Sequence, residues 1–213
     1  TLEDQVAELE RDPRAEAESP VPCDPDRPAD VLHDADQIAR TLRGVGFDVI
    51  KLTDTDTSAM RQAFIEFSRR LKRQDSVGVF YYAGHAVQVA GQNYLIPIGA
   101  DISAESEIPV QAVNLQELLG AMKGAAARVK IVILDACRNN PFESSARGLS
   151  RGLAAVVAPA GTLIAYATAP GEVALDGNDG HSPFTSALSR IIPTPGLEVE
   201  EVFKRTRAAV LEA

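Results

Sequence analysis

The sequence predicts an α/β fold in which a mostly parallel β-sheet is flanked by helices. Residues 76–83 and 129–134 are short, almost continuous apolar runs, which are typical of strands buried on both faces. Segments with apolar residues at helical spacing lie before, between and after these runs. Strands that alternate with helices along 213 residues indicate an α/β sandwich that forms one domain, or one large domain with a tail.

Two helices and a short strand are predicted ahead of the first buried strand. Apolar residues recur every three or four positions over 31–42 and again over 60–71, as on the buried face of a helix. Gly44 and Gly46 end the first of these helices. Residues 47–52 are then predicted to form a short strand between the two helices.

The rest of the chain continues this alternation. Residues 93–98 are expected to form a hairpin strand, and Asn114 is the predicted N-cap of the next helix. Residues 161–167 form a further strand after the second buried run. Ser182 and Pro183 begin another helix as its cap and first-turn residue, and apolar residues over 199–210 mark a last helix.

The first 29 residues differ from the rest and are predicted to form an N-terminal arm or linker. Apolar residues keep a helical spacing over one short stretch, and five prolines then follow among acidic residues. Residues 30–213 are expected to form the folded domain.

Charge and composition exclude several classes of protein. Thirty acidic against 21 basic residues give a net charge of −9, which argues against nucleic acid as a partner and favours basic partners. No apolar run reaches the roughly 18 residues of a membrane helix. The chain begins at Thr1 without a signal-peptide pattern, so the cytoplasm and, after removal of a leader, the periplasm both stay open. Two cysteines make neither a disulfide framework nor a zinc site.

Residues with catalytic chemistry follow two of the predicted strands. His85 comes directly after 76–83, and Cys137 comes shortly after 129–134. Because ligands bind at the carboxyl ends of the strands in open parallel sheets, both side chains are expected at one site. Cys137 follows His85 after 52 residues in an Ala-Cys-Arg setting, which matches the local signature of a caspase.

Four segments together resemble the caspase-like cysteine peptidases, and in particular their bacterial, metacaspase-like branch, the orthocaspases. The resemblance covers roughly residues 29–213. It implies a caspase-like three-layer sandwich and the activity of a cysteine endopeptidase. The segments are Tyr-Tyr-Ala-Gly-His (81–85), Asn-Tyr-Leu-Ile-Pro (93–97), Asp-Ala-Cys-Arg-Asn-Asn-Pro-Phe (135–142) and Tyr-Ala-Thr-Ala-Pro-Gly (166–171).

A cysteine beside a histidine can hydrolyse peptide bonds. A free thiol has a pKa of about 8.5, so an imidazole is needed to take its proton or to stabilise the thiolate. Cys137 would attack the scissile carbonyl, and His85 would protonate the leaving amine. The backbone N–H of Cys137 and that of a residue beside His85 could hold the oxyanion. The resemblance implies the same donors, with Gly84 in a turn and Ala86 at a position where many relatives have glycine.

The resemblance also predicts which substrate side chain the site accepts. Animal caspases cleave after Asp with a Gln and an Arg in the pocket, and the matching positions here are Asp135 and Asp176, with Asp179 as the alternative for the second. An acidic pocket repels a carboxylate and pairs with a guanidinium or ammonium group. We therefore expect cleavage after Arg or Lys, a preference that metacaspase-like relatives share. The alternative for Asp135 is that it only caps the turn after its strand.

The segment 143–160 is a candidate processing linker. It is polar and contains glycine, and its Arg-Gly bonds after Arg147 and Arg151 would suit an Arg-specific peptidase. In relatives this region joins the larger and smaller catalytic parts and is often self-cleaved. Self-processing within 144–152 is one hypothesis, and an ordinary surface loop is the other.

The other residues with metal-binding or catalytic chemistry are assigned passive roles. Cys23 lies in the arm without a His motif, His33 lies on a polar helix face, and His181 lies in a turn-rich stretch. Metacaspases often need calcium, but no acidic cluster here matches a calcium loop, so no metal site and no cofactor is predicted and calcium activation stays open. These clusters are Asp54 with Asp56, and Asp176 with Asn178 and Asp179.

One strand that the resemblance implies is missing. Relatives carry an apolar strand of the type Ala-Leu-Val-Ile-Gly-Asn before the first helix, placed centrally beside the strands at 47–52 and 77–83. Residues 1–29 contain no comparable run. A sheet that lacks a central strand exposes unpaired backbone groups. Three explanations stay open. The region that holds this strand is deleted or rearranged, a partner chain supplies the strand, or the sheet closes differently and activity is compromised.

Two classes of function therefore compete. One is a cysteine endopeptidase with a Cys137–His85 dyad that acts on a peptide or protein substrate. No membrane partner is expected for it, and a homodimer or a strand-supplying partner chain are open alternatives. The other is a catalytically impaired caspase-like scaffold or interaction domain. The intact pair favours the first and the missing strand favours the second. A different Cys-dependent hydrolase or a redox protein is disfavoured, because the chain has no Cys-x-x-Cys and no evident third triad member.

Overall fold

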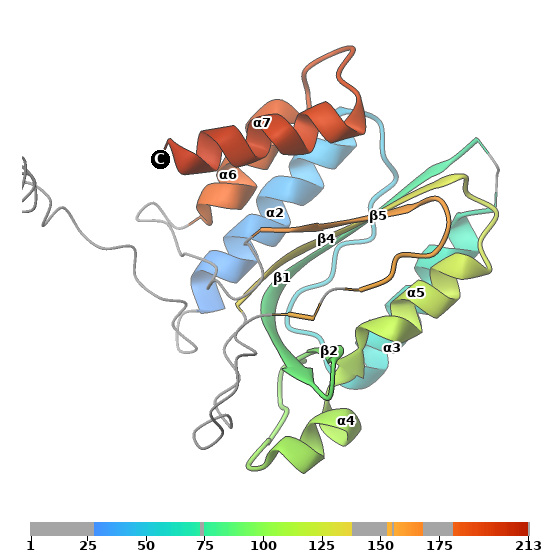
Figure 1. Ribbon diagram of the computed structural model, residues 1–213, viewed down its shortest axis with the longest axis vertical. Coiled ribbons are helices and arrows are strands. Elements are labelled where there is room, and N and C mark those ends of the chain that lie inside the picture. The colour runs from blue at the N-terminus through green and yellow to red at the C-terminus, as the bar shows by residue number, and fades with distance from the viewer. Residues whose placement is uncertain (1–27, 73–74, 138–152, 155, 168–180, 213) are drawn as a thin grey trace, which may run out of the picture.

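A central five-stranded sheet carries helices on both of its faces (Figure 1). The computed structural model describes residues 28–72, 75–137, 153–154, 156–167 and 181–212. In chain order its elements are α2 (Pro28–Gly44), α3 (Thr57–Arg70), β1 (Val77–Val89), β2 (Gln92–Leu95), the 3₁₀ helix η1 (Glu105–Glu107), α4 (Ile108–Gln111), β3 (Val113–Asn114), α5 (Leu115–Lys123), β4 (Val129–Cys137), β5 (Thr162–Tyr166), α6 (Pro183–Ile191) and α7 (Val199–Leu211).

The sheet is mixed, and its longest pairings are parallel. The strand order is β3-β2-β1-β4-β5, with β4 parallel to both β1 and β5. The far end of β1 pairs antiparallel with β2, which pairs antiparallel with β3. Ala90 and Gly91 both have positive φ, 49° and 76°, which is the geometry of a tight type I′ hairpin turn. The prediction of a mostly parallel sheet flanked by helices is confirmed.

Two apolar cores lie on the two faces of the sheet. On one face, α3 and α5 pack against Val132 and Leu134 of β4, and on the other, α2 and α6 pack against Ile131 and Ile133. Figure 1 shows α2, α6 and α7 together on one side of the sheet and α3 and α5 on the other. Because successive strand residues point to opposite faces, one apolar run supplies both cores. This explains why the run at 129–134 is continuously apolar.

Side-chain caps fix the beginnings of three helices. Asp56 accepts a hydrogen bond of 2.7 Å from the N–H of Ala59 and begins α3. Asn114 and Ser182 cap α5 and α6 in the same way, as the sequence predicted. Among the described residues, none of the helices has the length and apolar character needed to cross a membrane.

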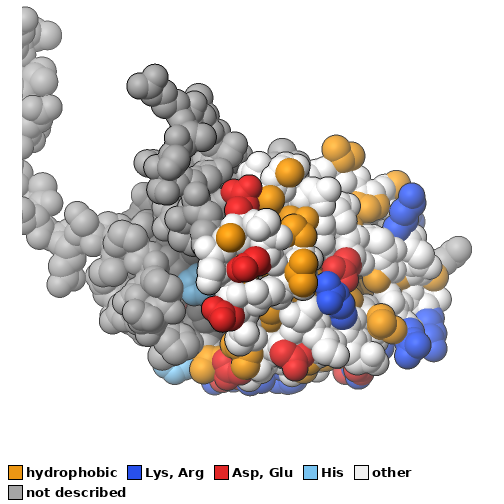
Figure 2. Space-filling model, turned by 90° about the horizontal axis from the view of Figure 1, so that it is seen from below, with side chains coloured by type: hydrophobic (Ala, Val, Ile, Leu, Met, Phe, Trp, Pro, Cys, Tyr) orange, Lys and Arg blue, Asp and Glu red, His pale blue; other side chains and the backbone are white. Residues whose placement is uncertain are grey.

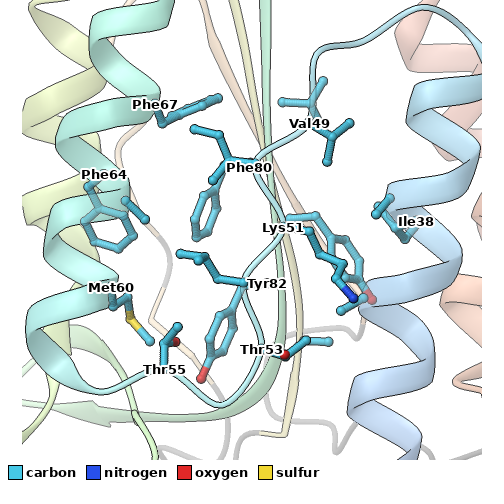
Figure 3. Close-up of a pocket in the computed structure, with 18 of the residues that line it drawn as sticks. Ile38, Val49, Lys51, Thr53, Thr55, Met60, Phe64, Phe67, Phe80 and Tyr82 are labelled. Atoms are coloured by element: carbon cyan, nitrogen blue, oxygen red, sulfur yellow. The ribbon is translucent and has the colours of Figure 1, made fainter.

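The predicted strand at 47–52 is wrong. In the described part of the chain, no backbone hydrogen bond joins residues 48–54 to another segment. These residues instead run between α2 and α3, and a pocket separates them from β1 (Figure 3). A strand needs a neighbouring backbone close enough for hydrogen bonds, and the described residues give this segment none, although Phe47 and Val49 still pack on the α2 core.

Candidate active site

The pairing of β1 with β4 brings His85 and Cys137 together at the carboxyl end of the parallel pairing between these two strands. The register runs from Val77 opposite Val129 to His85 opposite Cys137. Neighbouring strands lie about 4.8 Å apart, so the backbones of these two residues are adjacent. His85 lies inside β1 and Cys137 is the last residue of β4, because both strands continue beyond the ends at 83 and 134 that the apolar runs predicted.

Hydrogen bonds to its carbonyl oxygen hold the backbone of His85. The N–H of Ile96 donates to this oxygen at 2.9 Å, and the hydroxyl of Tyr82 donates to it at 2.8 Å. Burial raises the pKa of the Tyr82 phenol, which therefore stays neutral and keeps its proton for this bond. The position of His85 is thus fixed from its own strand and from the chain after β2.

Gly84 and Ala86, which were expected beside a turn, lie within β1. Gly84 pairs with Ala136, and Ala86 pairs with Leu95 of β2 and is 1% exposed. The reason is that β1 passes from its parallel to its antiparallel neighbour without a break. Gly84 has φ +148°, and a Cβ there would lie 2.8 Å from the Tyr82 hydroxyl oxygen, so this position favours glycine.

The carboxylate of Asp135 is buried below the carboxyl end of β4. Its side chain accepts hydrogen bonds from the hydroxyls of Ser182, Thr185 and Tyr81, the last two at 2.8 and 3.3 Å. Asp135 is 6% exposed and lies two residues before Cys137 on the same strand. Three hydroxyl donors therefore satisfy this buried carboxylate beside the site.

A second buried carboxylate belongs to the same network. Asp34 of α2 accepts hydrogen bonds from the backbone N–H of Ser182 at 3.1 and 3.3 Å, and its Oδ1 lies 3.2 Å from Nδ1 of His181. Ser182 therefore connects Asp34 to Asp135. Burial and then the charges of Asp135 and Asp34 raise the pKa of Tyr81 well above its ordinary value, so Tyr81 remains a hydrogen-bond donor.

Sequence reasoning missed most of this network. Ser182 was identified only as a helix cap, and Tyr81 and Thr185 carried no signal of their own. Asp34 did carry a signal in the sequence, because it follows Val31 by three residues and precedes Ile38 by four, and so lies on the apolar stripe of the helix. A charged residue on a buried stripe predicts a buried hydrogen-bonded partner.

The remaining candidate residues that the structure describes do not gather into a second site. Asp56 caps α3, and Asp54 is exposed with φ 50°. The exposed His33 lies near His181, with ring centroids 5.8 Å apart. Among the described residues, no three of His, Cys, Asp and Glu come together as metal ligands would. Outside the described residues are the arm at 1–27 with Cys23, the predicted linker sites Arg147 and Arg151, and Asp176, Asn178 and Asp179.

Figure 2 shows the molecule from the end at which β1 meets β2. Acidic side chains gather toward one side of this face, where a His side chain is also visible, while Lys and Arg lie mainly toward the other side.

The fold and the site define a class of protein. A three-layer α/β sandwich, with a His and a Cys in register at the carboxyl ends of neighbouring parallel strands, is the arrangement of a caspase-like protein. The family model described as "Caspase domain" matches residues 29–213. The chain therefore belongs to the caspase domain family, which confirms the resemblance found in the sequence at the level of that family.

Two mammalian proteins are similar over part of the chain. The human mucosa-associated lymphoid tissue lymphoma translocation protein 1 is 28% identical over 146 residues, which are 68% of this chain and 17% of the human protein. Its homolog from Mus musculus is 27% identical over 146 residues, with the same shares covered. The aligned stretch thus spans about a sixth of these relatives' length. The family is shown, and the metacaspase-like, bacterial branch stays a prediction.

Proposed function

We propose that the protein is a cysteine endopeptidase with Cys137 as its nucleophile and His85 as its general acid and base. The observation that carries this proposal is the register of β1 and β4, which makes the two residues direct neighbours at the strand ends. The caspase domain family is one of cysteine peptidases, which supports the same chemistry.

In the proposed reaction, His85 takes the proton of the Cys137 thiol, and the thiolate attacks the scissile carbonyl carbon. The tetrahedral intermediate collapses, its C–N bond breaks, and His85 gives the proton to the leaving amine. Water then hydrolyses the thioester and releases the second product. The backbone N–H of Cys137 and one beside His85, at Gly84 or Ala86, are the proposed donors to the oxyanion.

We expect the enzyme to cleave after Arg or Lys. Asp135 supports this preference, since its carboxyl group lies two residues before Cys137 on the same strand and is held in place by three hydroxyl donors. Asp176, or alternatively Asp179, is the proposed second acidic residue of the pocket.

The test is hydrolysis of fluorogenic tetrapeptides that end in Arg, Lys or Asp, with and without calcium. We expect turnover after Arg and Lys that falls about 100-fold or more in Cys137→Ala and in His85→Ala. Cys23→Ala and His33→Ala are matched controls and should retain wild-type rates. A calcium requirement would appear as turnover only in the calcium arm.

The role of Asp135 needs a readout that a purely structural role would not change. In Asp135→Asn, a specificity role lowers kcat/KM for Arg substrates relative to Asp substrates, whereas a structural role lowers the melting temperature and leaves this ratio unchanged. Cleavage only after Asp by the wild-type protein would contradict the proposed preference.

Self-processing is proposed for the Arg-Gly bonds after Arg147 and Arg151. Mass spectrometry of the purified protein should reveal fragments that end at these residues, and Cys137→Ala should stay intact. An intact wild-type chain after long incubation would contradict this part of the proposal.

The second candidate is a caspase-like scaffold without activity. The pocket between β1 and residues 47–55 favours it, because among the described residues one edge of the strand that carries His85 has no paired neighbour there. A folded protein that cleaves none of the peptides, with or without calcium, would support this candidate.

A further inference from the structure

His85 is the residue at which β1 exchanges one neighbouring strand for another. In the described pairing it is the last residue of β1 that pairs with β4, opposite Cys137, and Ala86 is the first that pairs with β2. The carbonyl oxygen of His85 accepts two hydrogen bonds here, from the N–H of Ile96 at 2.9 Å and from the hydroxyl of Tyr82 at 2.8 Å. Two donors outside β4, one from the main chain and one from a side chain, therefore hold the backbone of His85.

The hydroxyl of Tyr82 is committed to this contact. Its oxygen lies 2.8 Å from the carbonyl oxygen of His85 and 3.2 Å from that of Ile96, and a phenol has only one proton to donate. The shorter distance favours the bond to His85. Burial raises the pKa of the Tyr82 phenol, so the group keeps its proton near neutral pH. Its contribution to the site is therefore one of geometry and not of proton transfer.

The backbone between Tyr82 and His85 is shaped around this hydroxyl. Gly84 has φ +148°, and a Cβ at this position would lie 2.8 Å from the hydroxyl oxygen of Tyr82 and 3.0 Å from its Cζ. The tyrosine therefore reaches the carbonyl oxygen three residues ahead by passing over a position that only glycine fits. Tyr82, Gly84 and His85 form one local unit, in which a movement of any member disturbs the hydrogen bond to the carbonyl oxygen.

The ring of Tyr82 is anchored in the apolar core on the α3 side of the sheet. It packs against the cluster that contains Met60 and Phe64, as Phe80 does two residues earlier on the strand. Figure 3 shows Phe80 and Tyr82 on the side of β1 that faces Met60 and Phe64. Because protein interiors are closely packed, a ring held in this way gives its hydroxyl a fixed place. The hydrogen bond extends this constraint to the backbone of His85.

We propose that Tyr82 is a positioning residue of the catalytic pair, and this proposal rests on the proposed function of Cys137 and His85. The hydroxyl keeps the backbone of His85 where its imidazole can take the proton of the Cys137 thiol. Without the hydroxyl, the N–H of Ile96 is the remaining described donor, and His85 gains freedom to shift at the end of its pairing with β4. A displacement of about 1 Å can cost a reaction on the order of 100-fold, so the loss of one of two bonds is expected to cost about tenfold.

The first measurement follows the reactivity of Cys137 and needs no peptidase activity. All variants carry Cys23→Ala, which leaves Cys137 as the one cysteine of the chain. Iodoacetamide alkylates thiolates, so its rate between about pH 5 and 9 measures how well His85 activates the thiol. We expect His85→Ala to slow alkylation at about pH 6–7, and Tyr82→Phe to slow it about threefold or more in the same range. A purely structural role would lower the melting temperature and leave the pH profile unchanged.

The second measurement is hydrolysis of the Arg peptide by the same variants. Tyr82→Phe should lower kcat about tenfold and change KM less than about twofold, because the hydroxyl acts on His85 and not on the substrate. Gly84→Ala displaces the hydroxyl from the other side and should shift both measurements in the same direction.

Tyr94→Phe is the matched control. Tyr94 is a buried tyrosine of β2 that packs in a separate cluster with Ile108 of α4. Among the described hydrogen bonds, none joins its hydroxyl to His85. Removal of this hydroxyl should therefore leave the alkylation rate and kcat unchanged.

The outcomes distinguish this proposal from the proposed peptidase activity. Slow alkylation in His85→Ala with a wild-type rate in Tyr82→Phe would overturn the role of Tyr82 and leave the catalytic pair intact. Alkylation that His85→Ala leaves unchanged would overturn the pair and, with it, the positioning role. If no peptide is cleaved, the alkylation rates alone decide the role of Tyr82.

Two further results would also overturn the proposal. An equal loss in Tyr94→Phe and Tyr82→Phe would assign the effect to a general loosening of the fold. A change in KM alone would assign Tyr82 to substrate binding.

Discussion

The two edges of β1 differ in what they face. One edge is paired with β4 from Val77 to His85, and the side chains beneath it fill two cores, with Leu134 only 1% exposed. The other edge faces the pocket that separates β1 from residues 47–55, where Leu52 is 46% exposed. Both regions are rich in apolar residues. The difference teaches that an apolar pattern becomes a strand only where a neighbouring backbone lies close enough to form the hydrogen bonds of a sheet.

The largest difference between the two edges should appear in core truncations. Leu134→Ala removes a fully buried side chain and should lower the free energy of unfolding by about 2–5 kcal/mol. Leu52→Ala, on the pocket side, should cost less than about 1 kcal/mol, because the side chain is already half exposed. Urea denaturation of both variants measures this contrast, and equal losses would show that the pocket side is packed as tightly as the paired side.

Alkaline pH should weaken the fold through two neighbouring tyrosines of β1. The pKa values of Tyr81 and Tyr82 are raised by burial, so the folded state holds their protons above pH 10, where the unfolded chain releases them. Their stabilisation is therefore complete below about pH 10 and falls by about 1.4 kcal/mol per pH unit for each tyrosine above it.

Denaturation curves between pH 9 and 11 measure this loss. The variant with Tyr81→Phe and Tyr82→Phe should show a flatter decline, although its stability at neutral pH is lower. An unchanged slope in that variant would show that other groups cause the alkaline loss.

The point where β1 leaves β4 for β2 should be sensitive to a single methyl group. Gly84→Ala places a Cβ 2.8 Å from the Tyr82 hydroxyl oxygen at a φ of +148°, and should cost about 1–3 kcal/mol. In a double-mutant cycle, Tyr82→Phe removes that oxygen and should recover part of the loss. Strict additivity of the two substitutions would place the whole cost in the backbone angle.

The smallest effect is expected at the ion pair that joins α3, one wall of the pocket, to α5. Arg61 contacts Glu117 at 2.8 and 3.1 Å, and this hydrogen bond holds the pKa of Glu117 below its ordinary value. Both side chains are about 40% exposed, so Glu117→Gln should cost less than about 1 kcal/mol.

The pair's contribution is present at neutral pH and is lost as the pH falls below the ordinary pKa of glutamate, about 4.3. High salt should lower the wild-type stability toward that of Glu117→Gln at neutral pH. A difference that salt leaves unchanged would point to packing and not to charge.

Sequence reasoning was sufficient where the signal was local or repeated. The continuous apolar run at 129–134 predicted β4, and Asn114 and Ser182 were recognised as caps because their side chains satisfy the nearest helix N–H groups. The separation of His85 and Cys137 predicted a shared site, and the register of β1 and β4 brings the two residues together.

Sequence reasoning failed where the structure depends on distant segments. Residues 47–52 have a strand pattern, but the absence of a paired neighbour in the described chain decides their conformation. β1 runs on to Val89 because β2 returns beside it, which no property of 77–83 reveals. The bond between Asp34 and Ser182 joins residues 148 positions apart, so only the packing of α2 against α6 could show it.

Tyr81 and Tyr82 are consecutive residues whose hydroxyls anchor opposite sides of the sheet. Tyr81 reaches Asp135 and Thr185 on the α6 side, while Tyr82 reaches the carbonyl oxygen of His85 on the α3 side. Because the Tyr82 hydroxyl also donates to the carbonyl oxygen of Ile96 at 3.2 Å, a rotation of β1 about its own axis would displace hydrogen bonds on both sides of the sheet. The two tyrosines therefore couple the rotation of β1 about its own axis to the position of α6 on one side of the sheet and to the position of His85 on the other.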